Sequence, residues 1–307
     1  MSTVNEFAPG IAIASNPAMV PSTEWIPICE IPLLIFVGLT GVGKSTTVQA
    51  LQNQGLPFTL LPDRRLLTDE LLIGYLQRQD GEAPHPVTDR ATRFALTRRY
   101  RELFPGGMGH ALSQLLVKRS GFQQTTEECN HAPTRTIPSS HGWLFDGLRG
   151  ANEVRSACQA LPLARFVVLA APDRFRVQRL LGRSDRFDQI AVASHHDETR
   201  DNTNEKKCFA KLGVPEADIL FTAEEAVQLL ALCEPPLGNG SVSVDDLRAK
   251  LKIVVAERNN YDPAATVATL QAEAPKRTLV IDTTQVRAVQ AAQQIVGWLM
   301  STEQNSE

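Results

Sequence analysis

The sequence lacks long apolar runs, and its cysteines are few and scattered. The 307 residues include five cysteines, none close to another, which suits a reducing compartment better than a disulfide framework. No stretch is long and apolar enough to cross a bilayer. Residues 1–32 also lack the basic start and apolar core of a secretion signal. These absences predict a cytoplasmic protein with no membrane partner.

A strong excess of one charge is also missing. The chain has 31 Lys and Arg residues against 34 Asp and Glu residues, a formal net charge of −3. Such a chain creates no overall field that attracts phosphates, so we expect no nucleic-acid partner. His195, His196, Asp197 and Cys208 are close in sequence but lack a regular ligand spacing, so no metal site is expected there. The oligomeric state is not predicted.

Apolar runs that alternate with helical patterns indicate the fold class. Five runs have the length and composition of strands, at residues 33–37, 56–61, 142–146, 165–170 and 278–282. Helical patterns cover residues 45–52, 66–77, 89–102, 108–118, 151–160 and 172–182, and a final helix extends to about Met300. This alternation predicts an α/β fold with a three-layer, doubly wound, parallel sheet of five strands.

The remaining segments suggest how the chain is divided. Residues 1–31 are rich in Pro, Ser, Thr and Ala, and we expect a poorly ordered extension unless its apolar pieces dock on the core. Residues 32–190 and 277–301 form the predicted core, and residues 302–307 a tail. Residues 191–276 form a predicted helical insertion before the last strand. Within it, Thr222 and Glu225 have capping-box spacing, and Asp262 before Pro263 marks another helix start.

One motif carries the functional prediction. The segment from Gly38 to Ser45 fits the P-loop (Walker A) pattern G-x-x-x-x-G-K-[ST], with a predicted strand before it and a helix after it. Glycines let backbone amides wrap a polyphosphate, and the helix directs its positive end at the phosphates. Lys44 would contact the β- and γ-phosphates, and the Ser45 hydroxyl would ligate Mg²⁺. The predicted nucleotide-binding residues are Gly38, Leu39, Thr40, Gly41, Val42, Gly43, Lys44, Ser45 and Thr46.

A carboxylate at the end of the third predicted strand completes the predicted metal site. Asp146 follows an apolar run about a hundred residues after the motif, where a second magnesium-orienting residue is expected. The predicted cofactors are therefore ATP and Mg²⁺, although the motif does not distinguish ATP from GTP. The alternative role for Asp146 is to cap a helix that begins near Leu148.

The segment Phe145-Asp146-Gly147-Leu148-Arg149 resembles the Asp-Gly-x-x-Arg element of P-loop nucleoside and nucleotide kinases. In that family the Asp acts through magnesium and the Arg contacts phosphate, which implies these roles for Asp146 and Arg149. The resemblance covers residues 33–190 and 278–300, and residues 194–275 have no counterpart in it.

The arginines after the fourth predicted strand resemble the arginine-rich helix that leads into the lid of these kinases. Arg176, Arg179 and Arg183 share one helical face. The resemblance implies that Arg179 and Arg183 stabilise the transferred phosphoryl group. The alternative is a solvated basic face that pairs with nearby acidic residues.

A predicted acceptor site follows the second strand. Asp63 resembles the acidic residue that activates an acceptor hydroxyl in nucleoside kinases and related toxin-type kinases, and Arg64 and Arg65 would contact substrate. Asp63 would otherwise only satisfy a turn after Pro62. A second basic group, Arg90 and Arg93, lies on a later helix. The glycine-rich turn at residues 104–109 either offers amides to an anion or simply reverses the chain.

Together these features predict an ATP-dependent kinase that transfers a phosphoryl group to a small acceptor such as a nucleoside, a nucleotide or a related metabolite. The main alternative is a P-loop ATPase whose hydrolysis moves the helical insertion. No glutamate lies beside Asp146 to prime water, which disfavours an efficient hydrolase. A protein-binding module with a vestigial site is a third possibility, and the intact Lys44, Ser45 and Asp146 argue against it.

Overall fold

A computed structural model describes residues 4–14, 23–119, 142–182, 209–233 and 242–304. The chain divides into two compact units. Unit 1 comprises residues 1–38, 43–169 and 262–307, and unit 2 comprises Leu39–Val42 and Ala170–Tyr261. Arg183 and the sequence cluster of His195, His196, Asp197 and Cys208 lie outside the described residues.

Unit 1 is built on a five-stranded parallel sheet with helices on both sides, which confirms the predicted α/β class. Its strand order is β5-β7-β4-β8-β9. The strands are β4 (Leu33–Val37), β5 (Phe58–Leu60), β7 (Gly142–Leu148), β8 (Ala164–Ala170) and β9 (Thr278–Asp282).

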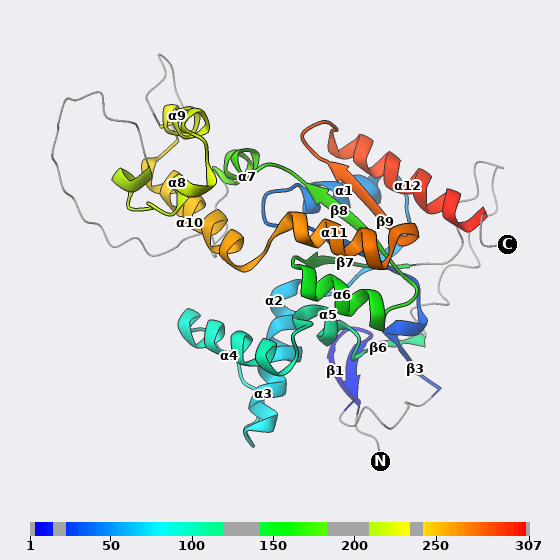
Figure 1. The fold of residues 1–307 in the computed structure, drawn as a ribbon. Coiled ribbons are helices and arrows are strands. Elements are labelled where there is room, and N and C mark those ends of the chain that lie inside the picture. Colours follow the sequence, from blue (N-terminus) through cyan, green and yellow to red (C-terminus); the bar gives the residue numbers. More distant parts are fainter. Residues whose placement is uncertain (1–3, 15–22, 120–141, 183–208, 234–241, 305–307) are drawn as a thin grey trace, which may run out of the picture. The chain divides into compact units, whose positions relative to one another are not determined.

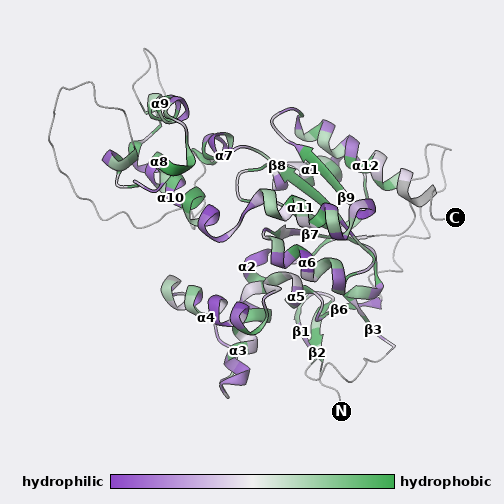
Figure 2. Ribbon diagram, in the orientation of Figure 1, coloured by the Kyte–Doolittle hydropathy of each residue, from purple (hydrophilic) through white to green (hydrophobic). Residues whose placement is uncertain are grey.

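Strand β4 lies at the centre of this sheet, and all five of its residues are buried. Leu33, Ile35 and Val37 pack into the main hydrophobic core of unit 1, and the two residues between them point to the opposite face. Both faces are covered, which explains why β4 is a continuous apolar run rather than an alternating one. In Figure 2 the neighbouring strand β8 is also mostly hydrophobic.

Two groups of helices pack against this sheet (Figure 1). The helix α6 (Ala151–Ala160) packs against α5 (Gly107–Leu112) and α11 (Pro263–Glu273), and all three contribute to the core that contains Ile35. Elsewhere in unit 1, α1 (Lys44–Asn53) packs against α12 (Ala288–Gln304). The predicted helix at residues 66–77 is divided into α2 (Arg64–Leu67), a π-helical turn η2 (Thr68–Ile73) and α3 (Gly74–Gln79). The helix α4 (Arg90–Leu103) matches its prediction closely.

A small antiparallel sheet corrects two predictions. Its order is β1-β2-β6-β3, with β1 (Val4–Ala8), β2 (Ile11–Ala14), β3 (Trp25–Pro27) and β6 (Leu115–Lys118). Much of the predicted poorly ordered extension therefore forms strands, and residues 115–118, predicted as helix, form β6. Leu115 and Val117 pack into the main core, whereas Leu116 packs with Ala12 and Trp25. Successive buried residues of β6 thus pack into different clusters, as expected for a strand that is covered on both faces.

The described part of unit 2 is mainly helical and has its own hydrophobic core. It contains α7 (Asp173–Leu180), η4 (Phe209–Leu212), α8 (Ala217–Leu220), α9 (Ala223–Ala231) and α10 (Val244–Asn260). Val177, Phe209, Leu229, Leu251 and Val254 are central to the core. The capping box of Thr222 and Glu225 opens α9 as predicted. The boundaries differ from the predicted insertion at residues 191–276, because α7 belongs to unit 2 and α11 to unit 1.

None of the helices that the structure describes combines the length and the apolar character needed to cross a bilayer.

We predict that Val117→Ala lowers the free energy of unfolding by about 1 to 3 kcal/mol, because it removes two methyl groups from a fully buried position. The matched control, Val289→Ala, changes a side chain that is 57% exposed and should shift stability by less than about 0.5 kcal/mol. Urea unfolding measures both values. Equal effects for the two variants would contradict the packing of β6 in the core.

Candidate functional site

A glycine-rich loop, Gly38–Gly43, joins the carboxyl end of β4 to α1. Three of its glycines have backbone angles that other residues rarely adopt, with φ of 150° at Gly38, 87° at Gly41 and 98° at Gly43. The Gly38 amide donates to the carbonyl of Leu148 at 3.0 Å, so the loop begins beside the end of β7. The loop thus leaves the sheet at the edge where parallel strands present their carboxyl ends, the usual ligand-binding edge of such folds.

The strand order places this loop where the winding of the sheet reverses. From β4 the chain moves to β5 and β7 on one side, and it later continues to β8 and β9 on the other. In open α/β sheets ligands bind beside the carboxyl ends of strands at such a reversal. The position of the loop therefore agrees with a ligand-binding role on topological grounds, independently of the sequence pattern.

The first turn of α1 combines a cation with exposed hydroxyls. Lys44 begins the helix, and its Nζ donates to the carbonyl of Gly38 at 2.8 Å, so the side chain folds back along the loop. Ser45 and Thr46 are exposed, and no acidic residue lies in this turn. The positive end of the helix is therefore not neutralised by its own sequence, which favours an anion at this position.

In unit 2 the loop residue Thr40 is held by two charged side chains. Its amide and hydroxyl donate to the Glu257 carboxylate at 3.0 and 2.6 Å, and its carbonyl accepts from Arg176 Nε at 2.8 Å. The Arg176 and Glu257 side chains are only 1% and 8% exposed and form an ion pair. Thr40 was predicted to contact nucleotide, yet its amide is already directed at a carboxylate. It therefore acts as an anchor of the loop.

The role of Glu257 was not predicted, although its position on the apolar face of a helix could have indicated it. In α10 the residues Leu247, Leu251 and Val254 form the buried stripe, and Glu257 follows at the same helical spacing. A carboxylate on the apolar face of a helix is costly unless it is paired, so its presence there indicates a partner.

The loop also packs directly against the backbone of α7. A Cβ atom added to Gly41 would lie 2.9 Å from the carbonyl oxygen of Arg176, so only glycine fits. Arg179 Nη1 donates to the Gly41 carbonyl at 3.4 Å. Arg176, predicted to share one basic helical face with Arg179 and Arg183, is buried, so the solvated alternative is wrong for this residue. The helix ends at Leu180, before Arg183, and the lid roles of Arg179 and Arg183 stay predictions.

Asp146 lies at an irregularity of β7. Ile35 pairs with Phe145 and Val37 with Leu148, so Asp146 and Gly147 together oppose Phe36 alone. Such bulges redirect side chains and are common beside active sites. The helix-cap alternative for Asp146 is wrong, because Gly150 is the N-cap of α6. Asp146 is half-buried, and no side chain among the described residues pairs with its carboxylate.

A buried ion pair fixes the backbone next to Asp146. Arg64 Nη2 donates to Glu153 at 2.6 Å, and Arg64 Nη1 donates to both Glu153 and the carbonyl of Gly147. Glu153 also accepts from the Arg149 amide at 3.0 Å. Arg64 was predicted to contact substrate. In the structure its guanidinium instead holds the bulge and the turn that follows.

The pKa of Glu153 reflects these contacts. Burial alone would raise it, but the charge of Arg64, the hydrogen bonds from Arg64 and the amide and charge of Arg149 together outweigh burial. The pKa consequently lies below its ordinary value of 4.5, and the carboxylate is ionised at neutral pH.

The other residues predicted to bind the phosphoryl acceptor lie on the segment after β5 and on α4. Asp63 is exposed and is the N-cap of α2, where its Oδ1 accepts from the Leu66 amide at 2.8 Å. The turn role proposed as its alternative is thus present, and it engages only one carboxylate oxygen. Arg65 is exposed beside it. Arg93 is paired with Asp69 on η2, and the side chain of Arg90 lies outside the described residues.

The glycine-rich segment at residues 104–109, which continues into α5, has a packing function. A Cβ atom on Gly109 would lie 1.9 Å from the carbonyl oxygen of Glu153, so α5 and α6 cross at backbone contact. This close approach requires glycine at residue 109, and the binding of an anion by the turn stays a prediction.

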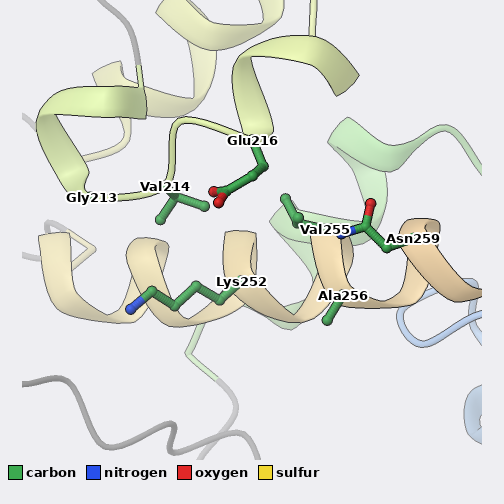
Figure 3. Close-up of a pocket in the computed structure, with 7 residues that line it drawn as sticks. All are labelled: Gly213, Val214, Glu216, Lys252, Val255, Ala256 and Asn259. Atoms are coloured by element: carbon green, nitrogen blue, oxygen red, sulfur yellow. The ribbon is translucent and has the colours of Figure 1, made fainter.

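Unit 2 also contains a shallow groove between the turn before α8 and one face of α10. Figure 3 shows Val214 and Glu216 on one wall and Lys252, Val255 and Asn259 on the other, and the volume is about 270 Å³. None of the predicted catalytic or binding residues lines this groove. Within the described ranges, the side chains of His, Cys, Asp and Glu form no group of three or more that is suited to a metal ion.

Comparison with known proteins finds no matching family model and no matching curated protein. The functional argument therefore depends on the residues and geometry of this chain.

We predict that Glu153→Gln lowers the free energy of unfolding by about 3 kcal/mol at pH 7, because it removes the buried carboxylate that pairs with the Arg64 guanidinium. The native pKa is depressed, so this contribution is fully present above about pH 4.5 and is lost as the pH falls through the native pKa. The stability difference between wild type and variant should therefore shrink on acidification. Urea unfolding at several pH values measures it.

Glu273→Gln is the matched control, because it removes a more exposed carboxylate that pairs with Arg155. Its effect should stay below about 1 kcal/mol. A Glu153→Gln effect that is equally small, or that does not change between pH 7 and pH 3, would contradict the buried pair.

Proposed function

We propose that the segment Gly38–Thr46 is a phosphate-binding P-loop in a three-layer α/β core, and that the protein transfers a phosphoryl group from Mg-ATP to a small acceptor. The observation that supports this most is the loop at the carboxyl end of the central strand, with Lys44 folded along it and an unneutralised helix start behind it. In this proposal amides of the loop other than that of Thr40 bind the phosphates.

The residues present fit a magnesium ion. Ser45 offers an exposed hydroxyl, and Asp146 offers a carboxylate at a redirected strand position. Oxygen donors of these kinds are what Mg²⁺ prefers, usually together with water and phosphate oxygens. Bound magnesium would neutralise charge on the β- and γ-phosphates and favour departure of the leaving group.

The chemical step breaks the bond between the γ-phosphorus and the bridging oxygen, and it forms a bond from that phosphorus to an acceptor oxygen. ADP leaves with the electron pair. For a hydroxyl acceptor the proton passes to Asp63, whose Oδ2 is not used by the helix cap. Lys44, and Arg179 with Arg183, stabilise charge on the transferred group. Arg65 and Arg149 contact the acceptor or its phosphate, and a nucleoside, nucleotide or related metabolite fits this basic surrounding.

A second candidate is an ATPase that uses hydrolysis to move the helices of unit 2. The contact of Thr40 with Glu257 and Arg176 favours it, because helices α7 and α10 are attached to the loop. The presence of glycine rather than glutamate after Asp146 disfavours it.

Nucleotide binding provides the first test. Lys44→Ala should weaken Mg-ATP affinity by at least about tenfold, since it removes a cation from the phosphates. Lys118→Met is the control, because it removes a lysine on β6 that pairs with Glu24 and Glu6. Isothermal titration calorimetry measures the affinities. Wild-type affinity in Lys44→Ala, or no affinity in the wild type, would contradict the proposed function.

An acceptor screen separates the kinase from the ATPase. We expect one class of nucleoside, nucleotide or related metabolite to accelerate ADP formation and to gain phosphate, as detected by mass spectrometry. With a hydroxyl acceptor, Asp63→Asn should lower kcat by about a hundredfold or more while nucleotide affinity is kept. If no acceptor changes the rate of ATP turnover, the ATPase replaces the kinase.

A further inference from the structure

Thr40 is held at all three of its polar groups by side chains of unit 2. Both its donors go to Glu257 and its carbonyl accepts from Arg176. These residues come from α10 and α7, which belong to the same unit as Leu39–Val42. The loop conformation in this unit is therefore set by two helices that are distant from it in sequence.

The charges around Thr40 are balanced within a small cluster. Arg176 pairs with Asp173 as well as Glu257, and Arg258 Nε lies 3.3 Å from the other oxygen of Asp173. Two cations thus compensate two anions. Without Arg176, the nearly buried Glu257 carboxylate would lose the positive charge of this ion pair beside the loop and would repel an approaching polyphosphate more strongly.

A close backbone contact at Gly41 holds the loop rigidly against α7. The loop approaches the α7 backbone so closely that a Cβ atom at Gly41 would contact the carbonyl oxygen and Cα of Arg176 at 2.9 and 3.1 Å. A shift of α7 therefore shifts the main chain of the loop, and any ligand that fixes the loop also fixes α7.

We propose that Arg176 and Glu257 are positioning residues for the phosphate-binding loop, and that through them nucleotide binding stabilises helices α7 and α10. This inference rests on the proposed function, because it requires that the loop binds a nucleotide. It adds that the helical unit responds to occupancy of the loop. The coupling is reciprocal, so a change that loosens α7 or α10 also weakens nucleotide binding.

The experiment uses hydrogen–deuterium exchange of the full chain with and without a magnesium complex of a non-hydrolysable ATP analogue. In the wild type, amides of α7 and of α10 near Glu257 should exchange at least about tenfold more slowly when the analogue is bound. Arg176→Met should abolish this added protection and weaken affinity for the analogue by about tenfold or more.

Arg248→Met is a closely matched control. Arg248 Nε donates to the carbonyl of Leu212, and the residue pairs with Asp245 three positions earlier, just as Arg176 binds the Thr40 carbonyl and Asp173. It lies nine residues before Glu257, about 13 Å along α10. Both variants lose one buried or half-buried arginine, but only Arg176→Met should lose the nucleotide-dependent protection.

Thr40→Val provides a second variant in case Arg176→Met does not fold. It replaces the hydroxyl bonded to Glu257 with a methyl group and should weaken analogue affinity several-fold, up to about tenfold, because the loop loses one of the hydrogen bonds that hold it in the binding conformation. Unchanged exchange of α7 and α10 in a wild type that binds the analogue would overturn the inference and leave the proposed function intact. Absence of analogue binding to the wild type would overturn both.

Discussion

Two buried guanidinium–carboxylate pairs hold the main chain where the central strands end. Arg64 and Glu153 fix Gly147 and Arg149 after β7, and Arg176 and Glu257 fix Thr40 after β4. Each pair directs its hydrogen bonds to backbone groups of a segment predicted to act in catalysis. The chemistry proposed here depends on these backbone positions, because a phosphate cradle made of amides works only if the amides are held in place.

Burying such ion pairs costs free energy. Removing two charges from water costs several kcal/mol per ion, and a well-packed apolar pair of similar volume often gives equal or greater stability. Their arrangement favours precise positioning of the backbone more than overall stability. In each pair, further hydrogen bonds are made to backbone carbonyls and amides and fix their positions. Gly41 and Gly109 serve the same end, because each permits a helix to approach the backbone more closely than any other residue would.

The central sheet was predictable from the sequence because buried parallel strands have continuous apolar sequences, as in Leu33–Val37. The glycine-rich loop was predictable because its residues are contiguous. The strand at residues 115–118 could not be predicted, because a short apolar run has no periodicity that distinguishes a strand from a helix. Its partner strands also lie about ninety or more residues earlier in the sequence. The contact between Thr40 and Glu257 joins residues 217 positions apart, so no local pattern could reveal it. Arg64 follows the second strand of the sheet as predicted, but its pairing with Glu153 was not foreseen.

The most direct measurement is a crystal structure of the protein with a magnesium complex of a non-hydrolysable ATP analogue. We predict that the triphosphate lies against the amides of Gly41 to Ser45 and that the Thr40 amide stays bonded to Glu257. Lys44 Nζ should turn from the Gly38 carbonyl toward the β- and γ-phosphates. A nucleotide bound elsewhere, or a loop whose amides remain directed away from a bound triphosphate, would contradict this prediction.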